Sequence, residues 1–207
     1  MLVLSGDKVE GAHADGTDWT IPSSVSCTQC HNAESGFALG LELAQLNGPL
    51  EHGCDVEAAD QYGNQMEMLE ALGVIEPLDF PTDSMPTMVD PWDEEAPLED
   101  RARAYLHSNC GSCHTAPENV CSGDLRWSAD LAQMGVCNVE PKIKLEEWAP
   151  GTMLLAPGQP ERSAILFHMN AEQETGAMPM PPLGRDHVDR KGTMLIRDWI
   201  ASLEGCE

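Results

Sequence analysis

The chain has 207 residues, and its 35 Asp and Glu against 11 Lys and Arg give a formal net charge of −24. Its length and its 42% hydrophobic content suffice for one large or two small domains. The charge excludes nucleic-acid binding, and no apolar run approaches the roughly 20 residues of a membrane span. Lys8 is the only basic residue before Arg101. This imbalance indicates a solvated acidic surface, a docking face for a basic partner, or both.

The first informative segment lies near the N-terminus. Residues 19–25 have an extended pattern that predicts no helix, and residues 27–31 read Cys-Thr-Gln-Cys-His. Cys-x-x-Cys-His is the attachment signature of haem c, in which the two thiols bond the porphyrin and the histidine ligates the iron. We therefore predict a covalent haem on Cys27 and Cys30, with His31 as its proximal ligand.

Two helices and a linker are predicted next. Leu and Ala enrichment favours a helix over 37–46, and apolar residues near helical spacing favour another over 64–75. A proline-rich linker follows over 77–97, and it contains the sequence Met-Pro-Thr-Met at 85–88.

The second half repeats the haem signature. Residues 96–109 predict a helix, because apolar residues recur at helical spacing after an acidic first turn. This helix leads into Cys-Gly-Ser-Cys-His, which predicts a second haem on Cys110 and Cys113 with His114 as proximal ligand. The two motifs divide the chain into predicted domains 1–95 and 96–207.

The remainder of the second half is rich in Gly and Pro until the last helix. Met-Pro-Met-Pro-Pro-Leu-Gly occupies 178–184, and residues 188–203 predict an amphipathic helix.

Zinc sites and redox dithiols are the alternatives for paired Cys-x-x-Cys motifs. Neither accounts for a histidine directly after both pairs, so the sequence favours two covalently attached haem c groups. Haem would also supply apolar bulk in a chain whose aromatic content is only 5%.

The order of features in the second half resembles that of class I cytochromes c. A helix with Cys-x-x-Cys-His, an irregular middle, a Met-Pro loop and a terminal helix follow one another. The resemblance implies that the first and last helices cross over the haem and that a loop methionine supplies the sixth iron ligand. By its position in Met-Pro-Pro, Met180 is the expected distal ligand, with Met178 as the alternative.

Most of residues 19–203 is similar to a family of secreted bacterial dihaem cytochrome c proteins. The similarity rests on residues 19–23, 39–41, 45–47, 64–65, 101–106, 109–110 and 180–184. It implies a mainly α fold, with two small cytochrome c-like helical haem domains and long irregular loops. Members resemble electron-transfer modules, sometimes attached to larger extracytoplasmic proteins.

The distal ligand of the first haem stays open between two methionines. Met85 precedes a proline and then a helix, as Met180 does, whereas Met68 would be a helix-borne ligand. Weaker alternatives are an open iron or one of Met66, Met88 and His52. The family pattern has leucine at positions 66, 85 and 88, so the resemblance does not decide between them.

Four cysteines lie outside the motifs. Cys121 and Cys137 are the expected disulfide, because they lie close together in one segment. Cys54 and Cys206 either pair with each other or stay free, and a haem-ligating Cys54 is a weaker alternative.

We expect an electron carrier rather than an enzyme. The alternative is a small dihaem peroxidase or related oxidoreductase with one open haem, and a haem-based sensor is a third. The histidines outside the motifs fit surface or packing roles: His13, His52, His107, His168 and His187. We expect a periplasmic or secreted bacterial protein, without its signal peptide or as a domain of a larger protein. Its partners would be redox proteins with a basic docking patch.

Overall fold

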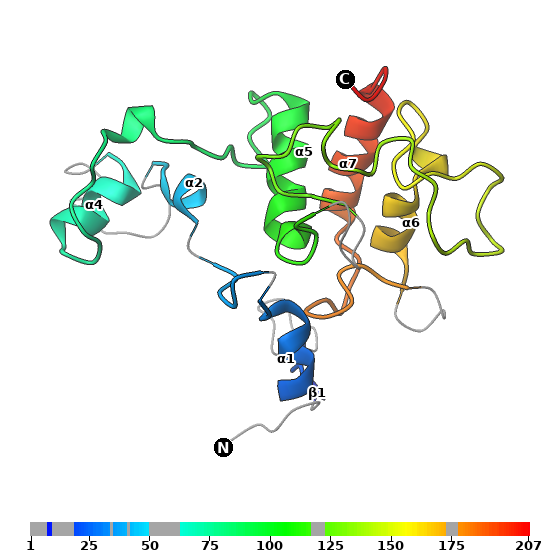
Figure 1. Ribbon diagram of the computed structural model, residues 1–207, viewed down its shortest axis with the longest axis horizontal. Coiled ribbons are helices and arrows are strands. Elements are labelled where there is room, and N and C mark those ends of the chain that lie inside the picture. The colour runs from blue at the N-terminus through cyan, green and yellow to red at the C-terminus, as the bar shows by residue number, and fades with distance from the viewer. Residues whose placement is uncertain are drawn as a thin grey trace. The chain divides into compact units, whose positions relative to one another are not determined.

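The computed structural model describes residues 8–9, 19–33, 35–40, 42–49, 63–116, 123–172 and 178–207 (Figure 1). The chain forms two compact units, unit 1 from residues 1–39 and 91–207 and unit 2 from residues 40–90. The regular secondary structure of the described residues is mainly helical, as the sequence predicts, and long irregular segments connect the helices. Both Cys-x-x-Cys-His motifs fall in unit 1, so the units divide the chain differently from the predicted domains 1–95 and 96–207.

The N-terminal part of unit 1 holds a short ribbon and a short helix. Strand β1 (Lys8–Val9) pairs antiparallel with β2 (Trp19–Thr20), and helix α1 (Ser24–Cys30) follows. The extended conformation predicted over 19–25 is therefore wrong for residues 24 and 25, which are helical. The helix begins there because the Ser23 hydroxyl accepts a hydrogen bond from the Ser26 amide at 3.0 Å, which caps the first turn.

Unit 2 contains the short helix α2 (Leu43–Leu46), α4 (Gln65–Ala71) and the 3₁₀ turn η1 (Thr82–Ser84). Both predicted helices exist but are shorter than expected. Phe37 has a φ of 65°, a left-handed conformation incompatible with the helix predicted from that residue. Gly73, at a φ of 68°, prevents the helix predicted over 64–75 from continuing to its expected end.

One buried side chain organises unit 2. Asn47 is 2% exposed, and its Oδ1 accepts a hydrogen bond from the Asn64 side chain at 2.8 Å. Its Nδ2 lies 2.9 Å from the Thr82 carbonyl oxygen, 2.8 Å from Thr87 Oγ1 and 3.2 Å from the Met85 carbonyl oxygen. The Met85 segment is thus tied to the elements around α2 and α4.

The rest of unit 1 is built on three helices. Helix α5 (Leu98–Leu106) continues into a π-helical turn, η2 (His107–Gly111), so the helix predicted over 96–109 is confirmed over most of its length. Helix α7 (Arg190–Ser202) confirms the predicted terminal helix. Helix α6 (Ala164–Asn170), preceded by the 3₁₀ turn η3 (Pro160–Arg162), was not expected within the loop-rich middle.

Helices α5 and α7 pack directly against each other in the core of unit 1 (Figure 1). A side chain at Gly192 of α7 would overlap the ring of Tyr105 on α5, so the close approach of the two helices requires glycine at this position. The Tyr105 hydroxyl donates to Asp189 Oδ2 at 2.9 Å, while Asp189 Oδ1 caps α7 by accepting from the Gly192 amide at 2.9 Å. Burial, followed by the Asp189 contact, raises the Tyr105 pKa above its ordinary value.

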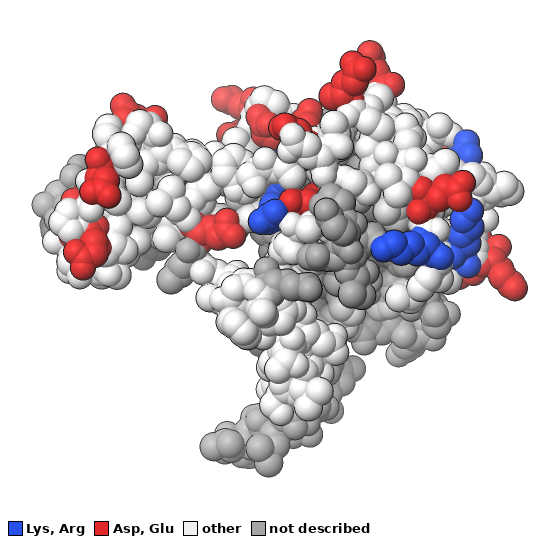
Figure 2. All heavy atoms as spheres, in the orientation of Figure 1, with Lys and Arg blue, Asp and Glu red and all other residues white. Residues whose placement is uncertain are grey.

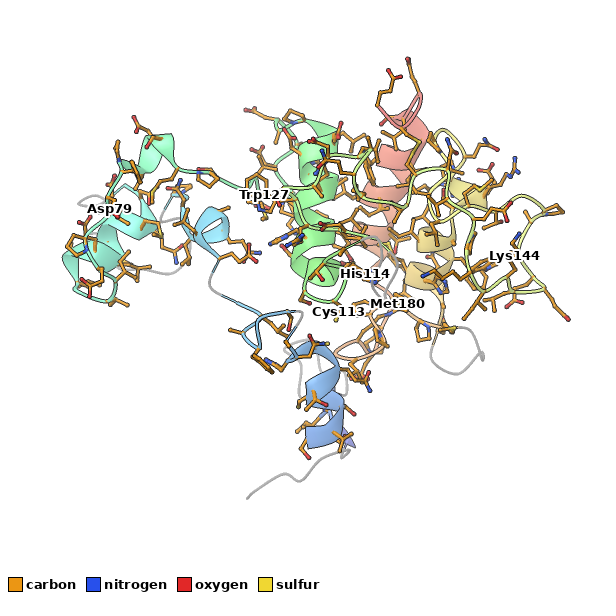
Figure 3. The ribbon with its side chains drawn as sticks, in the orientation of Figure 1. Asp79, Cys113, His114, Trp127, Lys144 and Met180 are labelled. Atoms are coloured by element: carbon orange, nitrogen blue, oxygen red, sulfur yellow. A yellow bond between two sulfur atoms is a disulfide. The ribbon has the colours of Figure 1, made fainter. Side chains whose placement is uncertain are left out.

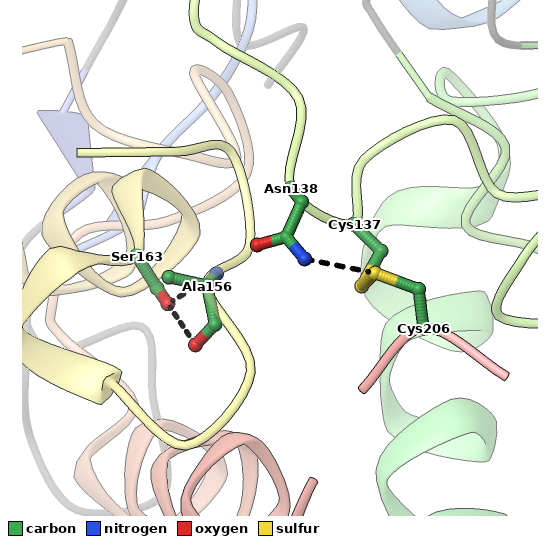
Figure 4. The surroundings of a disulfide bond; sticks show 5 residues. All are labelled: Cys137, Asn138, Ala156, Ser163 and Cys206. Carbon is green, nitrogen blue, oxygen red and sulfur yellow. Dashed lines mark hydrogen bonds between the residues drawn. A yellow bond between two sulfur atoms is a disulfide. The ribbon is translucent and has the colours of Figure 1, made fainter. Parts of the chain in front are cut away.

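A disulfide joins Cys137 to Cys206, just beyond the end of α7 (Figure 4). The prediction that Cys137 pairs with Cys121 is therefore wrong, and so is the expectation that Cys206 pairs with Cys54 or stays free. Proximity in sequence suggested Cys121, but the fold returns the C-terminus to Cys137 and places the two Cα atoms 5.8 Å apart. Cys121 and Cys54 lie outside the described residues.

Acidic side chains are spread over the face shown in Figure 2, whereas Lys and Arg gather mainly at one edge, near the loop that carries Lys144. Within the described ranges, no helix has both the length and the apolar character needed to cross a bilayer.

Candidate haem site

The second Cys-x-x-Cys-His motif is fixed by its backbone. The amides of Cys113 and His114 both donate to the Cys110 carbonyl, at 3.1 and 2.9 Å, which closes a tight turn at the end of η2. The Leu125 amide then donates to the His114 carbonyl at 2.9 Å. Burial, together with the neighbouring Cys113, raises the pKa of Cys110 to about 12, so this thiol stays protonated at neutral pH.

An ion pair supports the segment beside this motif. Arg126 donates to Asp124 through its amide, its Nε and its Nη2, at 3.1, 2.9 and 2.6 Å, and its Nη2 also reaches the Thr115 carbonyl at 2.8 Å. Burial acts to raise the Asp124 pKa, but the hydrogen bonds and the charge of Arg126 outweigh it and hold that pKa below its ordinary value. The pair therefore ties residues 124–126 to Thr115, the residue directly after His114.

The segment that carries Met180 is held from two sides. The Met180 amide donates to the His168 carbonyl at 3.0 Å, and its own carbonyl accepts from Arg185 Nη1 at 2.6 Å. Arg185 also donates to the Ala171 carbonyl, so one guanidinium links the methionine segment to the end of α6. These contacts fix the backbone that presents the Met180 thioether.

The two segments meet at a cavity of about 250 Å³ (Figure 3). Cys110 and His114 line it together with Met180, and Met178 also reaches it. Its other walls come mostly from aliphatic side chains, among them Leu125, Val136, Leu154 and Ile165. The volume approaches the roughly 300–1,000 Å³ of small-molecule sites. Three of the residues predicted to hold the second haem, Cys110, His114 and Met180, thus line one cavity, although Met180 follows His114 by more than sixty residues. Cys113 is not among the lining residues.

The side chains that line the cavity are of the chemical types that bind a haem. A thiol, an imidazole and a thioether are the groups that bond haem c and its iron, and aliphatic walls suit a porphyrin face. Trp148 also lines the cavity, and its indole Nε1 is buried with no hydrogen-bond partner among the described residues. A buried donor of this kind requires an acceptor, and a haem carries carboxylates that can supply one.

A larger hollow of about 550 Å³ lies against η3, α6 and α7. Its charged lining comes from Glu147, Glu161, Glu172 and Arg197, and no cysteine, histidine or methionine of the described residues reaches it. It therefore offers no ligand for a haem iron.

The first motif shows one feature of a ligating histidine. His31 Nδ1 lies 2.7 Å from the Phe37 carbonyl oxygen, so it carries the proton and leaves Nε2 as the ligating nitrogen. Cys30 Sγ lies 3.4 Å from Cys113 Sγ, which brings the two motifs together within unit 1. Met68 and Met85 belong to unit 2, so the choice between them stays a prediction.

Sequence reasoning assigned His168 to a surface or packing role, yet its ring lines the cavity beside Met180. No sequence signal marks it, because only the fold places α6 next to the haem motif. Among the described residues, no three His, Cys, Asp or Glu side chains are arranged to share a metal ion.

No family model, curated protein or solved structure matches this chain. The argument for its function therefore rests on its own residues.

Proposed function

We propose that this protein is a dihaem c-type cytochrome that carries single electrons between extracytoplasmic redox partners. The observation that carries the proposal is the apolar cavity in which Cys110, His114 and Met180 meet. When bound, each haem would accept and release one electron at its iron.

Each residue of the second site has a distinct role in this proposal. Cys110 and Cys113 hold the cofactor through thioether bonds, His114 is the proximal ligand and Met180 the distal one. The aliphatic walls would contact the porphyrin, and Arg185 keeps the Met180 backbone in place. A histidine–methionine ligand pair raises the reduction potential and leaves no open position for a substrate. We therefore assign electron transfer rather than catalysis.

The first site is proposed on its motif. Cys27 and Cys30 hold the first haem, His31 is its proximal ligand, and either Met85 or Met68 is its distal ligand. The Cys30–Cys113 sulfur contact of 3.4 Å supports an electron path between the two haems, since it brings their attachment points together.

The location and partners follow from other features. The Cys137–Cys206 disulfide supports a periplasmic or secreted protein, because disulfides persist in oxidising compartments. A net charge of −24 supports redox partners with a basic docking patch, since opposite charges accelerate encounter.

The first experiment is a haem count by intact mass, together with visible spectra of the dithionite-reduced protein before and after carbon monoxide. We expect two covalent haems and spectra that carbon monoxide leaves unchanged. A chain without haem would refute the proposal. Carbon monoxide binding at one haem would instead favour the peroxidase or sensor, because it reveals an open or labile iron position.

Matched variants assign the two sites. Replacing Cys110 and Cys113 by Ala should remove one haem by mass, and the same change at Cys27 and Cys30 should remove the other. As a control, replacing the disulfide pair Cys137 and Cys206 by Ser should leave the haem count at two. Loss of haem in the control but not in a motif variant would contradict the assignment.

A further inference from the structure

A second histidine lines the cavity of the proposed second haem. His168 lies in the last turn of α6, and its ring contributes to the same walls as His114, Met178 and Met180. It does not belong to either Cys-x-x-Cys-His motif. An imidazole at this place is chemically distinct from the aliphatic walls, because it can donate a lone pair to iron.

The hydrogen bond made by His168 determines which nitrogen can ligate. His168 Nδ1 lies 2.6 Å from the Met178 carbonyl oxygen, and a carbonyl only accepts, so Nδ1 carries the proton. In the neutral ring, Nε2 then holds the lone pair, and it has no hydrogen-bond partner in the part of the chain that the structure describes. Histidines that bind metals usually donate their other N–H to a carbonyl or carboxylate in this way. His31 shows the same arrangement with Phe37.

The ring is also held in position. Its centroid lies 5.5 Å from that of Trp148 and 5.8 Å from that of Phe167, both in edge-to-face geometry. The His168 carbonyl accepts the Met180 amide at 3.0 Å. His168 is therefore hydrogen-bonded to Met178 through its ring and to Met180 through its backbone. These contacts keep it beside Met180 in the cavity.

We propose that His168 is a second distal ligand of this haem and takes the sixth position when the Met180 thioether leaves the iron. This inference rests on the proposed function. In the exchange, the iron–sulfur bond breaks and a bond to Nε2 forms, with no net transfer of protons or electrons. Because methionine ligation gives the higher potential, the histidine form is the more reducing one. The site thus has two six-coordinate states of different potential.

The test compares Met180→Ala, Met180→Ala/His168→Ala and Met180→Ala/His187→Ala in the full, haem-loaded chain. His187 is exposed and does not line the cavity, so its variant controls for loss of a histidine. We expect Met180→Ala and the control to stay low-spin, with the near-infrared charge-transfer band of bis-histidine ligation and no more carbon monoxide binding than the wild type. Adding His168→Ala should make one of the two haems high-spin and able to bind carbon monoxide.

Three results would overturn the inference. A high-spin iron in Met180→Ala would show that His168 does not reach the iron. A methionine–iron band as strong as in the wild type, instead of one reduced to the share of the first haem, would show that Met178 takes the position or that Met180 does not hold it. A low-spin iron in the His168 double variant would assign another ligand. Each is distinguishable from failure of the proposed function, which would appear as missing haem by mass.

Discussion

Gly192→Ala tests the crossing of α5 and α7 in the unit that holds the proposed second haem site. The added methyl group would overlap the Tyr105 ring. The ring cannot move aside freely, because its hydroxyl is hydrogen-bonded to Asp189. Either the helices separate or Tyr105 rotates away and loses that bond. In both cases the variant destabilises unit 1.

The size of the effect follows from three contributions. Overpacking a core costs about 1–3 kcal/mol. Loss of a hydrogen bond to a charged group costs about 1.5–3 kcal/mol. Replacing Gly by Ala in a helix stabilises it by about 1 kcal/mol, which offsets part of this cost. We therefore expect Gly192→Ala to lower the free energy of unfolding by about 1.5–5 kcal/mol.

Denaturant unfolding followed by circular dichroism measures this change, and a double-mutant cycle with Tyr105→Leu provides the control. Leucine removes the phenol ring, so Gly192→Ala should cost much less in that background. A Gly192→Ala variant as stable as the wild type would refute the packing argument. An equal cost with and without Tyr105 would show that another contact is responsible.

Three further predictions follow from the described contacts. Asp124→Asn should lower stability at neutral pH by about 1.5–3 kcal/mol. Because Arg126 holds the Asp124 pKa low, the wild-type pair stabilises the fold above the unfolded pKa of about 3.9 and loses this contribution below it, so acid titrations of the two proteins should converge. A constant difference down to low pH would contradict this assignment. Replacing Cys137 and Cys206 by Ser opens a loop with a sequence separation of 69 and should cost about 2–4 kcal/mol in thermal or denaturant unfolding; an unchanged midpoint would argue against the disulfide. Asn47→Ala should destabilise unit 2 by about 1–3 kcal/mol, seen as faster hydrogen exchange in α4 but not in α7. Equal acceleration in both helices would contradict a local role.

Local signals made the two Cys-x-x-Cys-His motifs recognisable and the two long helices predictable. Cys-x-x-Cys-His is contiguous, so it needs no knowledge of the fold. Helices α5 and α7 show apolar periodicity with acidic or capping residues at their starts, as Asp189 does for α7. The expected position of Met180 came from the resemblance, and the fold brings that residue to the cavity of His114.

Features that depend on distant contacts were not predictable in this way. Helix α6 has only seven residues and lies among prolines and glycines, so its periodicity is too short to be recognised. Cys206 reaches Cys137 only because α7 returns the C-terminus to that loop. His168 has no motif around it, and its relevance emerges only from the cavity. Phe37 has a left-handed backbone, so the helix that composition favoured over 37–46 cannot begin at that residue.

The disulfide has a topological consequence for the proposed haem site. The segment from Cys137 to Cys206 contains α6, Met180 and α7, whereas Cys110, Cys113 and His114 precede it. Met178, Met180 and His168 therefore all lie within one covalent ring, and the second Cys-x-x-Cys-His motif precedes that ring in the chain. A single proteolytic cut within the ring leaves both fragments joined through sulfur. Such a nicked molecule separates into pieces on a gel only after reduction, and until then Met180 stays covalently connected to Cys110, Cys113 and His114.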